Sequence, residues 1–213
     1  MDSKTLQFII DHAEDDPAKL ALRASLFPEI NINFAVRQIA ARQRAKNKIP
    51  TFYANPEILY PSQLAIEQSS SEITARHKAS LVSGKRIVDL TGGFGVDFYF
   101  MAKKIEESWY VERQTELCEI ASYNFPLLGL QNYSVINADS QEYIDTMPCV
   151  DVVIVDPHRR SKTGRKLVFL SDCEPDLTTL VPVLFKKSKM VLAKLSPMLD
   201  IHKAVNDLPS TVQ

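Results

Sequence analysis

Residues 89–97 read DLTGGFGVD, and this stretch decides the fold. It continues the β-branched run RIVDL (86–90), so a strand ends in glycines and a helix opens directly after them. Such a turn brings backbone N–H groups and the positive end of the helix close to a ligand. No Gly-Lys-Ser/Thr follows, which excludes a P-loop. The dinucleotide fingerprint needs a third small residue where this sequence has Phe98, so a nicotinamide dinucleotide is disfavoured but stays open.

Four further runs of the same kind follow along the chain, and helical segments separate the early ones. They are WYVE (109–112), YSVINA (133–138), VDVVIVD (150–156) and KMVLAKL (189–195). Short apolar strands that alternate with helices are typical of βαβ units around a buried parallel sheet. The sequence therefore predicts an α/β fold with a parallel sheet in which five strands are visible.

A carboxylate stands at the carboxyl end of each of the first four expected strands: Asp89, Glu112, Asp139 and Asp156. Strand carboxyl ends line one edge of an open α/β sheet, so we expect these side chains to face one crevice. Glu112 follows Asp89 by 23 residues, where an acid can accept both hydrogen bonds of a ribose diol. Asp139 is placed to reach an adenine amino group. The set predicts a nucleoside-bearing ligand.

Before residue 85 the pattern is helical and shows no convincing strand. The Asp-Pro pair at 16–17 predicts one helix start, because the aspartate can cap a helix whose first residue has no N–H to satisfy. Asn31 predicts the start of a second helix.

Three prolines between 50 and 61 predict an irregular connector after these helices. A further helix is expected over 71–82. Ser69 and Glu72 stand at capping-box spacing at its start, and Gly84 follows it as a stop signal.

The charges nearly cancel, with 25 Lys and Arg against 26 Asp and Glu and a net charge of −1 over 213 residues. This balance excludes a protein whose whole surface is polybasic, while it permits local basic patches. No apolar run approaches the roughly 18 residues of a membrane span, and the N-terminus lacks the charge order of a signal peptide. The three cysteines are spaced for neither a disulfide framework nor a metal site. We therefore expect a reduced, cytoplasmic protein with no metal and no membrane partner.

The glycine turn resembles the first motif of class I S-adenosylmethionine-dependent methyltransferases, an acid separated by three residues from Gly-x-Gly. Glu112 matches the ribose-binding acid of that family, Asp139 its adenine-contacting acid, and Asp156-Pro157 its fourth motif. QSSSEITARHKASLVSGKRIVDLTGGFGVDF (68–98), followed by DPHRR (156–160), is similar in more detail to a bacterial group of RNA methyltransferases. That group carries a helical N-terminal region and a C-terminal THUMP-like domain.

The resemblance implies S-adenosylmethionine as the cofactor and assigns its contacts residue by residue. Ser70 is implied to approach the methionine end of the cofactor. The other implied cofactor-binding residues are Asp89, Thr91, Gly92, Gly93, Gly95, Glu112 and Asp139.

Two departures from that group set the expected domains. No THUMP-like domain follows, and the sequence stops at Gln213, where a sixth strand is due. We therefore expect a helical N-terminal region over 1–66 and a C-terminally truncated S-adenosylmethionine-dependent methyltransferase domain over 67–213. Strands six and seven are expected to be missing, which leaves the fifth strand as an exposed edge and can leave this chain inactive.

Asp156 and Pro157 suit an amine acceptor, because the carboxylate can accept its N–H bonds and orient its lone pair. We expect the catalytic residues to be Asp156, Pro157 and His158, with the histidine in place of the aromatic residue that stacks on a flipped base. The basic residues directly after them, Arg159, Arg160 and Lys162, are expected to bind the phosphate backbone of the substrate. A second basic run suggests the same partner: Arg37, Arg42, Arg44, Lys46 and Lys48.

The leading hypothesis is an S-adenosylmethionine-dependent methyltransferase that methylates a base nitrogen in RNA, either tRNA or rRNA. Three alternatives stay open at this point. They are methyl transfer to a protein or a small molecule, a nicotinamide-dependent oxidoreductase, and an RNA-binding module without turnover.

Overall fold

The computed structural model describes residues 1–159, 170, 173–196 and 201–208. The chain forms two compact units, and each is built from separate stretches of sequence. The helical unit comprises Met1–Leu81, Gly93–Lys103 and Thr115–Gln131. The sheet unit comprises Val82–Gly92, Lys104–Gln114 and the described residues from Asn132 onward. The N-terminal region is thus part of a unit that takes in two later segments of the chain.

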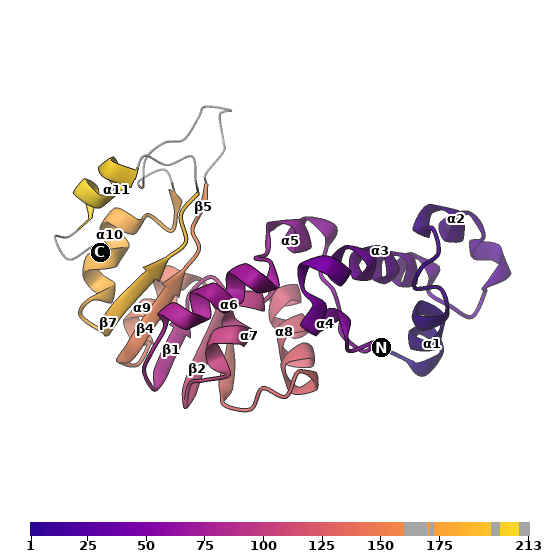
Figure 1. Ribbon diagram of the computed structural model, residues 1–213, viewed down its shortest axis with the longest axis horizontal. Coiled ribbons are helices and arrows are strands. Elements are labelled where there is room, and N and C mark those ends of the chain that lie inside the picture. Colours follow the sequence, from indigo (N-terminus) through magenta and orange to yellow (C-terminus); the bar gives the residue numbers. More distant parts are fainter. Residues whose placement is uncertain (160–169, 171–172, 197–200, 209–213) are drawn as a thin grey trace. The chain divides into compact units, whose positions relative to one another are not determined.

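The sheet unit is built on five parallel strands in the order β3-β2-β1-β4-β7 (Figure 1). The strands are β1 (Arg86–Asp89), β2 (Glu107–Glu112), β3 (Tyr133–Asn137), β4 (Val150–Val155) and β7 (Ser188–Ala193). All five predicted strands and their parallel pairing are confirmed. Asp89 at the end of β1 pairs with Tyr110 of β2 on one side and Ile154 of β4 on the other. The end of β1 therefore lies where the strand order reverses, which is the usual ligand position in such sheets.

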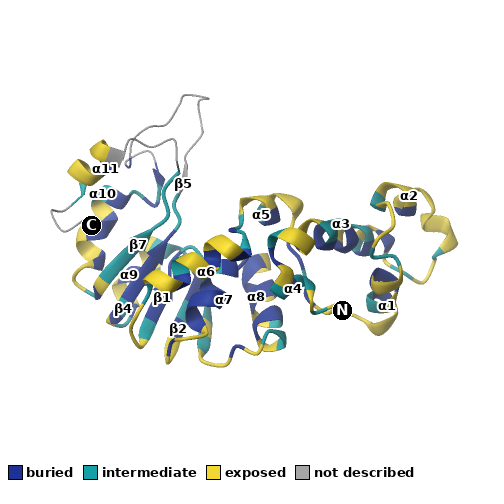
Figure 2. Cartoon of the chain, viewed as in Figure 1, coloured by how far each residue is buried: buried dark blue, intermediate teal, exposed yellow. Residues whose placement is uncertain are grey.

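Three helices of the sheet unit follow its strands: α9 (Ser140–Thr146), α10 (Leu177–Leu184) and α11 (Ile201–Asp207). Asp139 caps α9 and Asp176 caps α10, each by accepting a backbone N–H of the first turn. Leu177 and Leu184 of α10 are fully buried in one core with the strands. Strands β1 and β4 are almost entirely buried (Figure 2). This burial explains why their sequences read as continuous apolar runs.

Asp151 of β4 fixes the start of β1. Its Oδ2 accepts the backbone N–H groups of Lys85 at 2.7 Å and Arg86 at 3.1 Å. Its Oδ1 accepts a hydrogen bond from Lys189 Nζ at 2.7 Å. The hydrogen bond from Lys189, together with the two backbone donors, lowers the pKa of Asp151 to about 2. Asp151 is therefore ionised wherever the protein is folded above that pH.

A second, two-stranded antiparallel sheet is formed by β5 (His158–Arg159) and β6 (Cys173–Glu174). His158 is the backbone partner of Glu174. The peptide bond between Glu174 and Pro175 is cis. This sheet was not predicted, because strands of two residues carry no readable periodicity.

The helical unit begins with α1 (Ser3–Asp11), α2 (Pro17–Leu22), a 3₁₀ turn (Ala24–Leu26) and α3 (Ile32–Lys48). Both predicted helix starts are confirmed. Asp16 accepts the N–H of Ala18 at 2.9 Å, and Asn31 accepts the N–H of Phe34 at 3.1 Å. The three helices share a small core: Phe8, Ile9, Leu20, Ile32, Ala35 and Ile39.

The segment after α3 contains helices where an irregular connector was expected. They are α4 (Pro50–Tyr53) and α5 (Gln63–Gln68), whereas α6 (Glu72–Leu81) confirms the helix predicted over 71–82. The expectation was wrong for Pro50, which begins α4, because a proline is tolerated at the first position of a helix. Of the two helices that were missed, each spans six residues or fewer, too short to show a period.

The predicted capping box at α6 is also wrong. Ser69 donates its hydroxyl to the carbonyl of Ile66, and Glu72 instead accepts the N–H and the hydroxyl of Thr51, each at 2.8 Å. Burial raises the pKa of Glu72, but the hydrogen bonds from Thr51 and Arg76 outweigh it and hold the pKa below its usual value. Glu72 therefore ties α4 to α6 rather than capping its own helix.

Two later helices complete the helical unit: α7 (Val96–Ala102) and α8 (Thr115–Leu127). Phe98 of α7 packs on Phe125 of α8 at a ring-centroid distance of 5.3 Å, and both are fully buried. Asn124 of α8 accepts the N–H of Leu59 at 2.9 Å and donates to its carbonyl at 2.7 Å. Residues far apart in the sequence are thus held together inside this unit.

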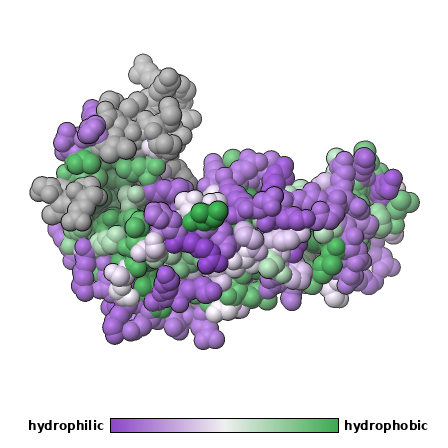
Figure 3. Space-filling view, viewed as in Figure 1, coloured by the Kyte–Doolittle hydropathy of each residue, from purple (hydrophilic) through white to green (hydrophobic). Residues whose placement is uncertain are grey.

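The face of the helical unit that Figure 3 shows is mainly polar, with some apolar side chains around α1 and α2. Leu22 is 87% exposed and Leu26 is 68% exposed. Among the described helices, none is long and apolar enough to cross a membrane.

Candidate active site

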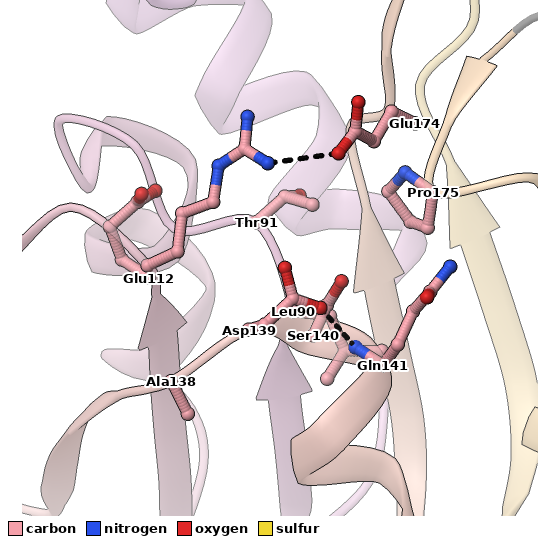
Figure 4. Close-up of a pocket in the computed structure, with 10 residues that line it drawn as sticks. Leu90, Thr91, Glu112, Ala138, Asp139, Ser140, Gln141, Glu174 and Pro175 are labelled. Atoms are coloured by element: carbon pink, nitrogen blue, oxygen red, sulfur yellow. Dashed lines mark hydrogen bonds and ion pairs between the residues drawn. The ribbon is translucent and has the colours of Figure 1, made fainter.

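A cavity lies at the carboxyl edge of the parallel sheet, within the sheet unit (Figure 4). It is an open depression that holds about 520 Å³ of space, with the solvent at its mouth included. Residues that follow β1, β2 and β3 line it, together with the end of β6. The lining residues are Leu90, Thr91, Glu112, Arg113, Ala138, Asp139, Ser140, Gln141, Glu174 and Pro175.

Two of the four predicted acids line this cavity from neighbouring strands. Glu112 ends β2, is 7% exposed, and accepts the backbone N–H of Gln114 on Oε1 at 2.9 Å. Asp139 follows β3 and accepts the N–H of Gln141 on Oδ1 at 2.8 Å. These bonds fix the direction of each carboxylate at the cavity (Figure 4). Two fixed carboxylates side by side can accept hydrogen bonds from the hydroxyl or amino groups of a ligand.

Asp89 and Thr91 connect the end of β1 to the end of β4. Asp89 is 2% exposed, and its Oδ1 accepts the N–H of Thr91 at 3.0 Å. Thr91 lines the cavity, and its Oγ1 accepts the N–H of Asp156 at 2.6 Å. Asp89 therefore fixes the backbone of the turn at Thr91. Thr91 in turn fixes the backbone of Asp156, the residue predicted to orient the acceptor.

The glycines of the turn are required for two different reasons. A Cβ on Gly92 would lie 2.2 Å from the ring of Tyr110, so no larger residue fits there without moving that ring. Gly93 has φ of 55° and Gly95 has φ of 83°, a backbone conformation that glycine adopts at no steric cost. Gly95 is also the residue from which α7 begins.

Seven of the lining residues were not predicted as site residues: Leu90, Arg113, Ala138, Ser140, Gln141, Glu174 and Pro175. Arg113 Nη1 pairs with Glu174 Oε1 at 3.0 Å, and both residues line the cavity. Arg113 directly follows Glu112, and Gln141 lies two residues after Asp139, so their positions offered a signal. Glu174 offered none, because it reaches the cavity only through the unpredicted pairing of β5 with β6.

Asp156 lies directly after β4 and pairs with Lys194, which lies directly after β7. Lys194 Nζ is 2.5 Å from Asp156 Oδ2, and both side chains are about one-third exposed. The backbone N–H of Lys194 also donates to the carbonyl of Val155 at 2.9 Å. Lys194 was not predicted, although its place at the end of the fifth strand matches the rule that selected the acids.

The other residues of the predicted acceptor region continue from Asp156. Pro157 follows it and is partly buried, and His158 and Arg159 form β5. Arg160 and Lys162 lie outside the described residues.

Ser70 lies in the helical unit and is 7% exposed. Its hydroxyl donates to Asp97 Oδ2 at 2.8 Å and accepts from Lys78 Nζ at 2.8 Å, while Lys78 also pairs with Asp97. Ser70 is therefore part of a polar cluster with Lys78 and Asp97, and its contact with a cofactor stays a prediction.

Most basic side chains of the run on α3 bond to other residues of the helical unit. Arg42 is 8% exposed and donates to the carbonyls of Tyr53 and Asn55. Lys46 pairs with Glu14 at 2.7 Å, and Lys48 donates to the last carbonyls of α5. Of the basic run that suggested an RNA partner, Arg42 is therefore buried and bonded within the helical unit.

Within the part of the chain that the structure describes, no group of three or more His, Cys, Asp or Glu could hold a metal ion. Cys118 and Cys173 are buried, and Cys149 is exposed.

No protein-family model matches the sequence, and no curated protein matches it. A crystal structure does match over nearly the whole chain: a "putative methyltransferase" from Porphyromonas gingivalis W83, at 30% sequence identity and a TM-score of 0.82. The match covers 98% of this chain and 53% of that protein, so this chain spans about half the length of its relative. The strand order and this likeness together identify the Rossmann-like fold of class I methyltransferases.

Looser structural matches carry related names. A SAM-dependent methyltransferase from Agrobacterium tumefaciens is 18% identical with a TM-score of 0.43, and the match covers 59% of this chain and 44% of that one. An rRNA methylase from Streptococcus thermophilus is 13% identical with a TM-score of 0.41, covering 57% and 69%. Similarity at this level transfers nothing about activity to this chain.

Proposed function

We propose that this protein is an S-adenosylmethionine-dependent methyltransferase. The observation that carries the proposal is the pair Glu112 and Asp139, which line one cavity from the ends of neighbouring strands. The cavity also borders Thr91, in the turn that opens after β1. The name of the 30% identical solved structure supports the same reaction class.

The donors and acceptors of the cavity suit the nucleoside end of S-adenosylmethionine. A ribose diol offers two O–H donors and adenine offers an amino group, while Glu112 and Asp139 offer carboxylate acceptors. The described lining holds three carboxylates and one guanidinium, so its formal charge is −2 (one positive minus three negative). A negative lining favours a cationic sulfonium over the diphosphate of a dinucleotide. The charge therefore argues against a nicotinamide cofactor.

Bound S-adenosylmethionine supplies a methyl group on a sulfonium sulfur. An acceptor nitrogen would displace S-adenosylhomocysteine as the carbon–sulfur bond breaks, and it would then release its proton to water. The work of the protein is to hold the two reactants in line. We assign the acceptor to Asp156, whose carboxylate can accept an N–H of the incoming amine. Lys194, paired at 2.5 Å, fixes the direction of that carboxylate.

We further propose that the acceptor is a base nitrogen of RNA, in tRNA or rRNA, and that the chain belongs with the bacterial RNA methyltransferases that it resembles. The support is the order of residues along the chain. Arg159, Arg160 and Lys162 follow the acceptor motif directly, where a phosphate backbone would pass if a base reached Asp156.

Calorimetric titration with S-adenosylmethionine, S-adenosylhomocysteine and NAD tests the cofactor. We expect the first two to bind and NAD not to bind. Glu112→Gln keeps an oxygen for the N–H of Gln114 but removes the charge that would hold the ribose. It should weaken S-adenosylhomocysteine at least tenfold, because hydrogen bonds to charged groups contribute about 1.5–3 kcal/mol.

Glu107→Gln is the matched control, since Glu107 begins the same strand and pairs with Arg86 on the surface. It should leave binding unchanged. Binding of NAD without S-adenosylhomocysteine would replace the proposal by an oxidoreductase. Equal affinity of wild type and Glu112→Gln would place the cofactor elsewhere.

A further inference from the structure

Phe94 occupies the middle of the glycine turn, yet it is only 4% exposed. It is flanked by Gly93 and Gly95, both with positive φ. Turn tips usually carry small or polar residues because they face water. A buried phenyl ring at this place needs a partner, and that partner comes from the N-terminal part of the chain.

The ring of Phe94 packs on Phe52 of α4 at a centroid distance of 5.4 Å and on Tyr60 at 5.8 Å. Phe52 also meets Tyr99 of α7 edge-on at 5.4 Å. These four residues, Phe52, Tyr60, Phe94 and Tyr99, form an aromatic cluster whose members are at most 4% exposed. All four lie in the helical unit. The cluster joins the turn and α7 to residues some 40 positions earlier in the sequence.

The N-terminal side of the aromatic cluster is itself held rigidly by α3. Gln38 accepts the N–H of Tyr60 and donates to its carbonyl, both at 2.9 Å. Arg42 donates to the carbonyls of Tyr53 at 2.6 Å and Asn55 at 3.0 Å. Buried hydrogen bonds from Gln38 and partly buried ones from Arg42 therefore fix the backbone near Phe52 and Tyr60. Phe94 is packed on a rigid support.

We propose that Phe94 is a positioning residue, through which the N-terminal helices hold the glycine turn in its ligand-binding conformation. This inference rests on the proposed function and extends it, because it gives the first 60 residues a role in cofactor affinity. Glycine populates both signs of φ, so a turn with glycines on both sides of one residue is free to adopt many shapes. Fixing that turn before the ligand arrives removes an ordering loss from binding.

Phe94→Leu in the full chain tests the proposal, because leucine keeps the site apolar but loses the ring contacts. We expect S-adenosylhomocysteine to bind about tenfold more weakly, since releasing the backbone of a single residue is worth roughly that factor. Phe8→Leu is the matched control. Phe8 is 8% exposed in the same unit and packs on the ring of Phe27 at 4.9 Å, within the α1–α3 core.

Both variants should lower the urea midpoint, whereas only Phe94→Leu should change the dissociation constant. A folded Phe94→Leu protein that binds as tightly as wild type would overturn the proposal. So would an equal loss of affinity in Phe8→Leu, because that would reduce the effect to general stability.

Hydrogen exchange of the ligand-free chain gives a second readout that does not depend on the cofactor. The amides of Gly93, Phe94 and Gly95 should exchange at least tenfold faster in Phe94→Leu and unchanged in Phe8→Leu. Unchanged exchange in Phe94→Leu would also contradict the inference. If wild type binds no S-adenosylhomocysteine while the exchange result holds, the proposed function fails and the structural role of Phe94 stands.

Discussion

The Tyr60 hydroxyl is buried, and within the described part of the chain it has no hydrogen-bond partner. We expect Tyr60→Phe to raise the free energy of unfolding by about 1 kcal/mol, because an unsatisfied buried polar group costs about 1–3 kcal/mol. Urea denaturation at pH 7 measures this. Tyr123→Phe, on half-buried Tyr123 of α8, is the control and should change stability by less than about 0.5 kcal/mol.

The same substitution has a consequence at high pH. Burial raises the pKa of Tyr60 above its ordinary value of 10.0. Stability from a raised pKa is complete below the unfolded value and declines above it, so wild type should lose stability past about pH 10. Tyr60→Phe should lose less stability than wild type above about pH 10, because it lacks the ionisable hydroxyl. A Tyr60→Phe protein that is less stable at pH 7 would show that the hydroxyl is needed.

Single residues of the site could be predicted from the sequence where they stand at the end of a predicted strand. Glu112 and Asp139 were expected to face one crevice, and they line one cavity. Asp89 was expected there too, but its carboxylate turns to the N–H of Thr91. Strand position gives the edge of the sheet on which a residue lies, whereas hydrogen bonds decide where its side chain points. Glu174 could not be predicted as a site residue, because no periodic sequence pattern places it at the cavity.

At the scale of an element, Asp151 links β1, β4 and β7 through one carboxylate. The pKa of Asp151 in the folded protein, about 2, lies below the ordinary value of 3.8 for an aspartate. Stability from a lowered pKa is complete above the unfolded value and is lost as pH falls through the folded one. The stabilising effect of Asp151 should therefore be full at pH 5 and decline between about pH 4 and pH 2.

Asp151→Asn should reduce the loss of stability between about pH 4 and pH 2. Urea denaturation midpoints of wild type and variant at pH 7, 4 and 2.5 measure this loss. The gap between wild type and Asp151→Asn should narrow as the pH falls. Asp145→Asn, on an exposed residue of α9, is the control and should leave the dependence of stability on acid pH unchanged. A gap that stays constant with pH would show that Asp151 acts through packing alone.

Elements were predictable in proportion to their length and pattern. The five strands of the main sheet are β-branched runs of four to six residues, and each was found close to its true bounds. α4 and α5 were missed because prolines break the local pattern without breaking the helices. The pairing of β5 with β6 is a contact between segments 15 residues apart, and two residues on each side carry no signal for it.

At the scale of the whole molecule, the net charge of −1 means that RNA binding must come from a local basic surface. We expect binding to a single-stranded RNA to weaken steeply with salt. Arg159→Ala/Arg160→Ala should lower the slope of log affinity against log salt by up to about 1.4, or roughly 0.7 for each lost phosphate contact. Fluorescence anisotropy between 50 and 200 mM salt, a range in which phosphate contacts are strongly screened, measures it.

Lys19→Ala/Lys104→Ala removes the same charge from exposed positions elsewhere and should leave the slope nearly unchanged. An unchanged slope in the arginine variant would instead favour methylation of a protein or a small molecule. The position of the basic residues in the sequence supports this prediction, because charge balance over the whole chain says nothing about a local surface.

The division into two units could not be read from the sequence. Helical and strand patterns change near residue 85, which suggests one boundary, but α7 and α8 join the helices of the first 81 residues. Side-chain contacts such as Asn124 with Leu59 decide this, and local periodicity does not record them. The same interleaving gives the N-terminal helices their hold on the glycine turn.

That interleaving also sets the order of events during protein synthesis. The six segments of the two units alternate along the chain, so the backbone crosses between units five times. Helices α1 to α6 leave the ribosome before their partners in α7 and α8 exist. The aromatic cluster cannot close until Tyr99 has emerged, and the bond to Leu59 must wait for Asn124. The helical unit can be completed only when residue 131 has emerged, and the sheet unit only later. Until then the nascent chain has to keep its N-terminal apolar surface from aggregating.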